Sequence, residues 1–231
     1  MRTFKVMCNN VRGVKSKEEI IKRIIHEENP VIMALVETKL TKDDVFEIDG
    51  YEIKRNDRTA DGGGVLLAYK KSLINIMKLV SKYNDHNSEV LWMKLDNGVE
   101  KIRIGVVYMP QECRTLLKDI QSIYKSITDE AKAAVENGEK IMILGDFNCK
   151  IGLEIAGNNE EVSKGGRELL KLANKLSLKI LNSHKCCSGL WTRQQDDERS
   201  VLDYILIKKE DVKQVNLMKI DGERDVTPTC D

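Results

Sequence analysis

The sequence predicts an α/β (α+β) fold, with sheets covered by helices. The N-terminal third begins with a strand, a helix and a second strand, the order that builds a parallel pair. The middle of the chain holds several short β-branched runs separated by Gly-rich turns, which is typical of antiparallel strands. The second half alternates long helical patterns with short apolar strands.

Composition places the chain among globular proteins. It has 231 residues, of which 41% are hydrophobic and 32% are charged. Because no Pro-rich or low-complexity segment interrupts it, we expect one domain over residues 1–231 and a monomer. The net charge of +1 argues against a strongly basic nucleic-acid wrapper, although a local basic groove remains compatible with it.

The cysteine and histidine pattern does not predict a structural zinc site. None of the six Cys forms a C-x-x-C pair, and the three His are scattered. Free thiols in a reducing, intracellular compartment are the simplest interpretation. The longest apolar runs, such as Val31–Val36, are far too short to span a bilayer, so we expect no membrane partner.

The first elements follow from apolar patterning. Residues 4–7 predict a strand, and Ser16 with Glu19 predicts a capping box at the start of a helix. Residues 31–36 form an uninterrupted apolar run, as expected for a strand with both faces covered. This strand delivers Glu37 at its carboxyl end.

The middle of the chain reads as an antiparallel meander. Gly62-Gly63-Gly64 and Asp96-Asn97-Gly98 supply turns, and Tyr108 stands at the exit of the last strand. The expected strands cover residues 51–55, 65–69, 74–80, 89–95 and 101–108.

The second half predicts two long helices, over residues 115–135 and after Gly165-Gly166. Strands are expected at residues 141–144, 178–181, 201–207 and 215–220. The strand 201–207 contains Asp203, and a carboxylate inside an apolar strand needs a partner.

The most informative stretch is the strand 141–144 with the residues that follow it. Gly145 allows a turn, and Asp146 and Asn148 can then point the same way off the strand end. The carboxyl ends of buried strands are where open α/β sheets carry their chemistry. The alternative is a strand followed by an Asx-rich turn without a function.

Several oxygen-bearing side chains occupy comparable positions at strand exits or inside strands. Each alone is a common turn residue, but together they predict an oxygen-rich site at one edge of two sheets. They are Asn10, Glu37, Asp146, Asn148, Asp203 and Asp231. Such a site suits Mg²⁺ or Mn²⁺ and the hydrolysis of a phosphate ester.

Short motifs in a fixed order over nearly the whole chain then indicate a family. They are Asn9-Asn10-Val11-Arg12-Gly13, Val36-Glu37-Thr38-Lys39-Leu40, Gly62 to Ala68, Val107-Tyr108-Met109-Pro110, Leu144 to Asn148, Trp191-Thr192 and Ser200 to Leu206. In these the chain resembles the endonuclease/exonuclease/phosphatase superfamily. Within it, the resemblance is closest to the endonuclease domain of non-LTR (LINE-type) retrotransposons and their domesticated relatives. It implies a DNase I-like, four-layer fold: a two-sheet sandwich with flanking helices.

The resemblance also implies roles. Asn10 and Glu37 would lie beside the catalytic metal, with Glu37 a direct ligand. Tyr108 would contact the scissile phosphate. Asp146 would position and activate water, and Asn148 would hydrogen-bond the phosphate in the transition state.

The remaining roles concern the family's terminal Ser-Asp-His motif. Asp231 matches its Asp, near the metal and among the catalytic residues, and Asp203 matches the acid that orients its His. Asn9 stands where the family has Trp, and Cys230 replaces Ser. The sequence ends at Asp231, where the His and a closing strand would follow. We therefore expect this form to be weak or inactive, and less stable than a longer one.

The function that the resemblance implies is a Mg²⁺-dependent DNA endonuclease, which nicks one strand and leaves a 3′-hydroxyl. It would be nuclear if it acts on chromosomal DNA. For each basic candidate for DNA contact the alternative is a solvated surface charge, and for Trp191 it is a core residue. The candidates are Arg12, Lys39, Arg55, Arg58, Lys70, Lys71, Arg193 and Trp191.

Two other functions stay open. One is a small-molecule phosphodiesterase or phosphatase of the same fold, because fold does not settle substrate. The other is a degenerate copy that binds nucleic acid or protein without cleaving. Retention of Glu37, Asp146, Asn148 and Asp203 argues against decay.

Overall fold

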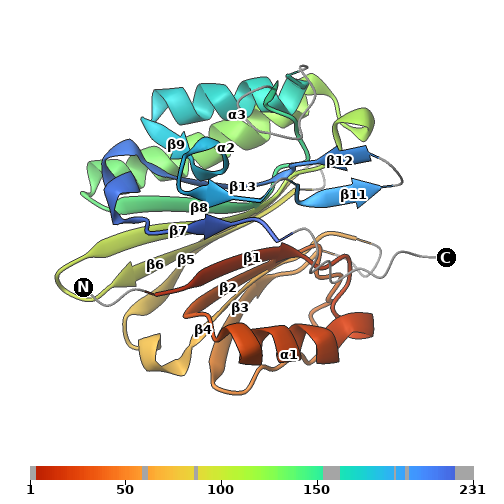
Figure 1. The fold of residues 1–231 in the computed structure, drawn as a ribbon, viewed down its shortest axis with the longest axis vertical. Coiled ribbons are helices and arrows are strands. Elements are labelled where there is room, and N and C mark those ends of the chain that lie inside the picture. The colour runs from red at the N-terminus through yellow and green to blue at the C-terminus, as the bar shows by residue number, and fades with distance from the viewer. Residues whose placement is uncertain are drawn as a thin grey trace.

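Two β-sheets stack face to face between two helical layers in the computed structural model (Figure 1). The structure describes residues 4–58, 62–85, 88–152, 162–189, 191–195 and 198–221. Helix α1 (Glu18–Glu28) covers the outer face of one sheet, and α2 (Leu117–Glu136) and α3 (Lys164–Lys175) cover the other. The predicted two-sheet sandwich with flanking helices is confirmed.

The smaller sheet has four strands in the order β1-β2-β4-β3. Strands β1 (Val6–Asn10) and β2 (Ile32–Val36) are parallel, which confirms the pair predicted from the strand–helix–strand order. Strand β4 (Val65–Lys70) is antiparallel to β2 and to β3 (Tyr51–Asn56). Every residue of β2 is buried, because α1 and the second sheet cover its two faces.

The larger sheet has six strands in the order β5-β6-β7-β8-β13-β9. They are β5 (Met77–Asp85), β6 (Ser88–Asp96), β7 (Lys101–Tyr108), β8 (Lys140–Asp146), β13 (Asp203–Lys208) and β9 (Leu178–Ile180). Only β7 and β8 are parallel neighbours within it. The expected single meander is wrong, since its first two strands belong to the smaller sheet.

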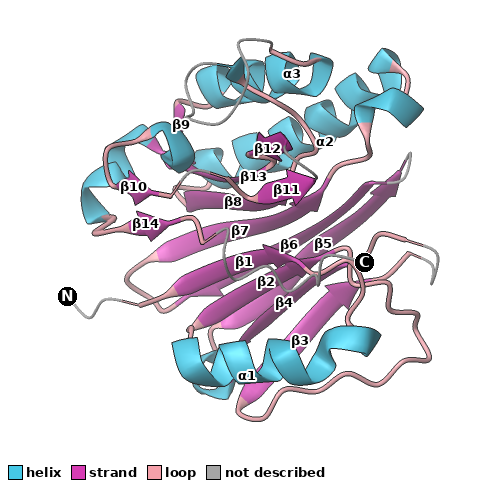
Figure 2. Cartoon of the chain, turned by 45° about the vertical axis from the view of Figure 1, so that its right-hand side comes forward, coloured by secondary structure: helices cyan, strands magenta, loops and turns pink. Residues whose placement is uncertain are grey.

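Short elements complete the chain. Strands β11 (Arg193–Gln195) and β12 (Glu198–Ser200) form a hairpin beside the start of β13 (Figures 1 and 2). Strands β10 (Cys187–Ser188) and β14 (Met218–Lys219) form a small parallel pair. The 3₁₀ turns are η1 (Lys15–Lys17), η2 (Lys71–Leu73), η3 (Glu112–Arg114), η5 (Leu181–Ser183) and η6 (Lys209–Gln214).

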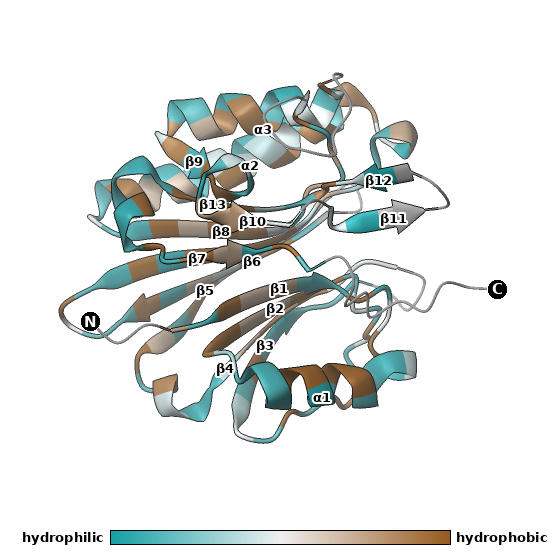
Figure 3. Ribbon diagram, in the orientation of Figure 1, coloured by the Kyte–Doolittle hydropathy of each residue, from teal (hydrophilic) through white to brown (hydrophobic). Residues whose placement is uncertain are grey.

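The apolar interior lies in three layers, of which the one between the sheets positions the site. Val36 and Leu67 of the smaller sheet pack with Leu91, Val106 and Leu144 of the larger one. These five side chains are fully buried. Colouring by hydropathy shows hydrophobic segments along the strands of both sheets (Figure 3). The packed side chains therefore fix how one sheet is offset against the other.

The two outer layers bury one face of each helix. Ile123 and Ile127 of α2 and Leu169 of α3 pack on the larger sheet, and Ile21 and Ile25 of α1 pack on the smaller one. Among the described residues no helix is long and apolar enough to cross a membrane. The five described cysteines are free thiols, as expected.

Three local expectations are corrected. The Ser16–Glu19 capping box is wrong: residues 15–17 form η1, and α1 begins at Glu18 without a side-chain cap. Asp203 begins β13 and does not lie inside it. Most of the strand expected at 215–220 is irregular, and only Met218–Lys219 pairs.

Strands β7 and β8 approach each other closely at Gly145. It has φ +145°, and a Cβ there would lie 1.9 Å from the carbonyl oxygen of its pairing partner Val107. We expect Gly145→Ala to lower the free energy of unfolding by about 3 kcal/mol or more. Urea denaturation measures the loss.

Gly98→Ala is the matched control. Gly98 also has a positive φ, +83°, but a methyl group at this position would have nothing within 4 Å. Gly98→Ala should lower the free energy of unfolding only through the unfavourable backbone conformation, by about 1–2 kcal/mol. Equal losses in the two variants would show that the β7–β8 approach carries no special constraint.

Candidate active site

Five predicted site residues converge at one edge of the sandwich. Strand β1 ends at Asn10, and Glu37 directly follows β2. In the larger sheet Tyr108 pairs in register with Asp146, and Asp146 pairs in register with Asp203. The carboxyl ends of β1, β2, β7 and β8 and the start of the antiparallel β13 thus meet at one edge, which brings together side chains from both sheets.

Asp146 is the centre of this group. Asn10 Nδ2 donates a hydrogen bond to Asp146 Oδ2 at 2.7 Å, and the Asn148 N–H donates to Oδ1 at 2.8 Å. The first of these bonds joins the two sheets. Asn10 Oδ1 accepts from the Arg12 N–H at 3.0 Å, and Asn148 Nδ2 donates to the Met109 carbonyl at 2.8 Å. Both amides are therefore held in fixed orientations around the carboxylate.

The environment of Asp146 adjusts its proton affinity. Its burial raises the pKa to about 6, and the nearby Glu37 carboxylate also acts to raise it. The hydrogen bonds from Asn148 and Asn10 and the charge of Arg193 act in the opposite direction. The balance leaves a carboxylate that can accept a proton near neutral pH.

Tyr108 has the opposite tendency. It is buried, and its pKa is raised first by that burial and then by the charges of Glu37 and Asp146. The phenol therefore stays protonated at neutral pH and can donate a hydrogen bond.

Unusual backbone conformations gather around the site. Of the six described non-glycine residues with positive φ, four lie here. They are Arg12 (+45°), Glu37 (+57°), Lys39 (+53°) and Asn148 (+46°). Conformations of this kind persist only where the surrounding structure enforces them, and they concentrate at functional sites.

The backbone of Asp203 is fixed by two side chains. Thr192 Oγ1 accepts from the N–H groups of Leu202 and Asp203, at 2.9 and 3.2 Å. Asn182 Nδ2 donates to the Asp203 carbonyl at 3.0 Å. The sequence indicated Thr192 through the Trp-Thr motif but gave no signal for Asn182.

The donor set fits a hard divalent cation in an open site. In the described part of the chain, no three His, Cys, Asp or Glu side chains come together to enclose a metal. The available donors near Asp146 are carboxylate and amide oxygens, chiefly those of Glu37 and Asn10. Mg²⁺ often uses only one or two carboxylates and keeps several waters. Asp231, the third expected ligand, lies outside the described residues.

Candidate DNA-contacting residues divide into two groups. Arg12 is exposed beside Asn10, and the Lys39 side chain lies against Gly13. Arg193 of the β11–β12 hairpin is near enough to Asp146 to lower its pKa. These three border the acidic side chains.

The others are placed differently. Arg58 Nε donates to the Gly62 carbonyl at 2.9 Å and lies 3.1 Å from the Glu89 carboxylate. Arg55 Nη2 donates to the carbonyls of Thr41 and Asp44, at 3.1 and 2.7 Å, and so fixes a loop. Lys70 and Lys71 lie at the opposite end of β4 from the site. The Trp191 ring lies 3.9 Å below the Arg199 guanidinium. Contact of any of these residues with DNA stays a prediction.

Sequence reasoning missed two residues close to the site. Glu89 is fully buried and pairs in register with Tyr108, and burial raises its pKa to about 7. Cys8 lies on β1, where desolvation and the charges of Asp203 and Asp146 raise its thiol pKa. Only the pairing of the strands and the stacking of the sheets reveal these neighbours.

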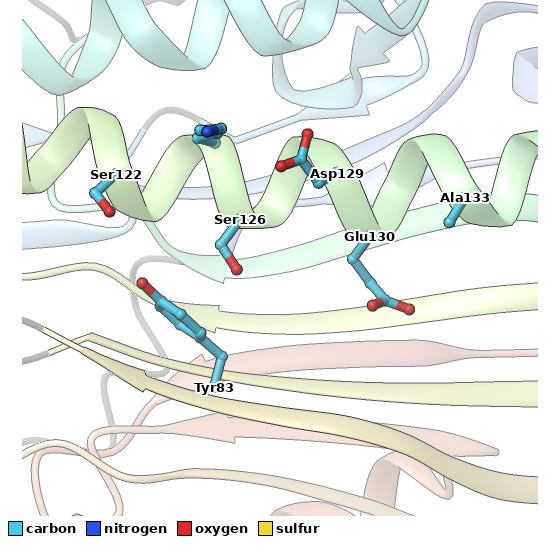
Figure 4. Close-up of a pocket in the computed structure, with 7 residues that line it drawn as sticks. Tyr83, Ser122, Ser126, Asp129, Glu130 and Ala133 are labelled. Carbon is cyan, nitrogen blue, oxygen red and sulfur yellow. The ribbon is translucent and has the colours of Figure 1, made fainter.

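A separate surface pocket of about 540 Å³ lies between β5 and α2 (Figure 4). None of the predicted site residues lines it. Its lining is mostly polar and consists of Tyr83, Ser122, Lys125, Ser126, Asp129, Glu130 and Ala133.

Solved structures share this fold. A 3′ phosphatase, NExo, from Neisseria bound to a product DNA hairpin is 14% identical, with a TM-score of 0.67 over 91% of this chain and 89% of that one. The 3′-5′ exonuclease NExo of Neisseria meningitidis is 15% identical, with a TM-score of 0.73 over 97% and 94%. The Xenopus laevis APE2 catalytic domain is 16% identical, with a TM-score of 0.65 over 90% and 83%.

At these identities the structures show the fold alone. No curated protein sequence matches the chain. A family model described as the Endonuclease/Exonuclease/phosphatase family, however, matches residues 9–219. Since that match spans most of the sequence, the chain belongs to the endonuclease/exonuclease/phosphatase family, whose members are metal-dependent nucleases and phosphatases.

Proposed function

We propose that this protein is a Mg²⁺- or Mn²⁺-dependent DNA endonuclease of the retroelement type, which nicks one strand and leaves a 3′-hydroxyl. The observation that carries the proposal is the setting of Asp146. Its carboxylate is buried, is hydrogen-bonded by Asn10 and Asn148, and lies in register with Tyr108 and Asp203.

In this mechanism Asp146 orients a water molecule and removes its proton. The water oxygen attacks phosphorus, the bond from phosphorus to the 3′ oxygen breaks, and that oxygen takes up a proton. Hydrogen bonds from Asn10 and Asn148 keep the carboxylate in one orientation while it accepts the proton. A pKa of about 6 lets Asp146 be mostly ionised at neutral pH and still act as a base.

Tyr108 and Asn148 supply donors for the phosphate. The protonated Tyr108 phenol can donate to a non-bridging oxygen, and the Asn148 amide retains a second N–H besides the one given to Met109. Donors fixed before the reaction stabilise charge that develops in the transition state.

Glu37 and Asn10, together with Asp231, would hold the metal. A divalent cation bound there supplies positive charge to the phosphoryl oxygens. Glu37 is half-buried, and its charge raises the pKa of both Asp146 and Tyr108, so a concentration of negative charge already exists at this edge.

A DNA substrate is supported by the position of Arg12, Lys39 and Arg193 around the acidic residues. One structure of similar fold holds a product DNA hairpin. The proposed enzyme is a monomer, and it would be nuclear if it acts on chromosomal DNA. Because the same neighbour is a 3′ phosphatase, removal of a 3′ phosphate is the second candidate activity.

Nicking of supercoiled plasmid tests the proposal directly. Asp146→Ala should lower the nicking rate by about 10²–10⁴, since the variant lacks the base. The isosteric Asp146→Asn should behave similarly while keeping the fold. Both this chain and a form extended by a His and a closing strand are assayed. Release of phosphate from a 3′-phosphorylated duplex without nicking would favour the second candidate.

Metal dependence is tested separately. EDTA should abolish nicking, and Mg²⁺ or Mn²⁺ should restore it, because the donors are oxygen atoms. Glu37→Gln should raise the Mg²⁺ concentration needed for half-maximal rate. Full nicking in EDTA would contradict the metal role of Glu37.

The salt dependence of DNA binding tests the basic rim. Arg12→Ala and Arg193→Ala should each weaken binding at all sequences and reduce the salt slope by about 1. Fluorescence anisotropy with Asp146→Asn protein measures binding without cleavage. Lys71→Ala, at the opposite end of the sheet, should leave the slope unchanged. If the salt slopes of Arg12→Ala and Arg193→Ala equal that of the protein without these substitutions, neither arginine contacts a phosphate.

A further inference from the structure

Beyond the ends of β2 and β4, two loops remain paired through their backbones. The Thr38 N–H donates to the Gly64 carbonyl at 3.1 Å, and the Lys39 N–H donates to the Gly63 carbonyl at 2.9 Å. Glu37 immediately precedes this pairing and has φ +57°. The triple-glycine turn therefore forms the surface against which the Glu37 loop is held.

A carboxylate from the other sheet fixes that turn. Glu89 of β6 accepts the Gly64 N–H on Oε2 at 3.0 Å. Arg58 Nε lies 3.1 Å from Glu89 Oε1 and donates to the Gly62 carbonyl at 2.9 Å. Glu89 has no exposed surface, so these partners compensate a fully buried charge.

The glycines leave the space that this arrangement needs. A Cβ at Gly63 would lie 2.6 and 2.7 Å from the two Glu89 carboxylate oxygens and 2.7 Å from Arg58 Nε. A Cβ at Gly64 would lie 2.4 Å from Thr38 Oγ1. Both glycines also have positive φ, +74° and +88°. The sequence of the turn is thus matched to Glu89 on one side and to Thr38 on the other.

We propose that Glu89, paired with Arg58, is a positioning residue that sets the place of Glu37 opposite Asp146 through the Gly63-Gly64 turn. The inference rests on the metal role proposed for Glu37. Glu89 belongs to the larger sheet, in register with Tyr108, whereas Glu37 belongs to the smaller one. Glu89 therefore couples the positions of the two halves of the site.

A second buried glutamate shows what a purely structural pair looks like. Glu139 lies 2.7 Å from Arg103 and 3.0 Å from Lys94, near the start of β8 at the far end of the same sheet. The Glu139 carboxylate thus pairs with two side chains, whereas Glu89 holds backbone that in turn holds Glu37. Glu139 is accordingly a matched control for Glu89.

The experiment measures Mn²⁺ binding to the full chain by electron paramagnetic resonance, alongside urea denaturation. Glu89→Gln should weaken Mn²⁺ affinity about tenfold or more, the usual effect of losing a group that orients a ligand. Glu139→Gln should lower stability and leave the affinity unchanged. Glu37→Gln, assayed in parallel, reports whether Glu37 binds the metal at all.

A second pair of variants covers the case in which Glu89→Gln does not fold. Gly63→Ala pushes a methyl group against the Glu89 carboxylate, whereas Gly50→Ala has a similar φ, +78°, with nothing within 4 Å. Both should cost stability, but only Gly63→Ala should weaken Mn²⁺ binding.

The outcomes separate the two proposals. If Glu37→Gln weakens binding while Glu89→Gln and Gly63→Ala do not, the positioning role is wrong and the metal site stands. If none of the three changes the affinity, the metal role of Glu37 fails and the positioning role fails with it. Weakening by all three, with Glu139→Gln and Gly50→Ala unchanged, supports both.

Discussion

The offset of the two stacked sheets is the constraint on which the site depends. Asn10 and Asp146 belong to different sheets, yet their side chains are joined by a 2.7 Å hydrogen bond. A slip of one residue along a strand moves a side chain by about 3.3 Å, which is more than a hydrogen bond tolerates. The apolar layer containing Val36, Val106 and Leu144 prevents that slip, because close-packed side chains allow few alternative arrangements. The positions of the side chains at the edge are therefore fixed by packing in the interior between the sheets.

This rigidity also explains how locally unfavourable features persist. Glu37, Lys39 and Asn148 have left-handed backbone conformations, and Asp146 and Glu89 are buried carboxylates with raised pKa values. Each feature opposes folding by roughly one to a few kcal/mol. The adjoining strand ends and backbone hydrogen bonds such as that from Lys39 to Gly63 hold the backbone at these positions, and neighbouring donors partly compensate the charges. Four of the six described non-glycine residues with positive φ, and the buried carboxylates of Asp146 and Glu89, thus lie at the edge where they can serve a reaction.

Local patterns predicted the elements but not their long-range neighbours. The apolar run 32–36 and the strand before Asp146 were predictable because burial on both faces leaves a continuous apolar sequence. The division of the middle strands between two sheets was not predictable, since hairpin signals indicate only which consecutive strands pair. Ser16 failed as an N-cap because a 3₁₀ turn precedes α1. The proposed role of Glu89 could not be predicted from the sequence, because it arises from the register with Tyr108 and from a contact with a turn beside the other sheet.

The charge distribution bears on the proposed substrate. The chain is nearly neutral overall, with a net charge of +1, yet acidic side chains gather at the edge where a phosphate is expected to bind. Asp146 and Glu37 alone would repel that phosphate, whereas Arg12 and Arg193 at the rim attract it. A cation bound among these acids would reverse the local sign of the charge, so the proposed metal and a phosphate polyanion would favour each other's binding, and by linkage that effect would be reciprocal. A site of this kind would gain affinity from a few local charges and not from a basic surface, so a nearly neutral protein is compatible with the proposed nucleic-acid substrate.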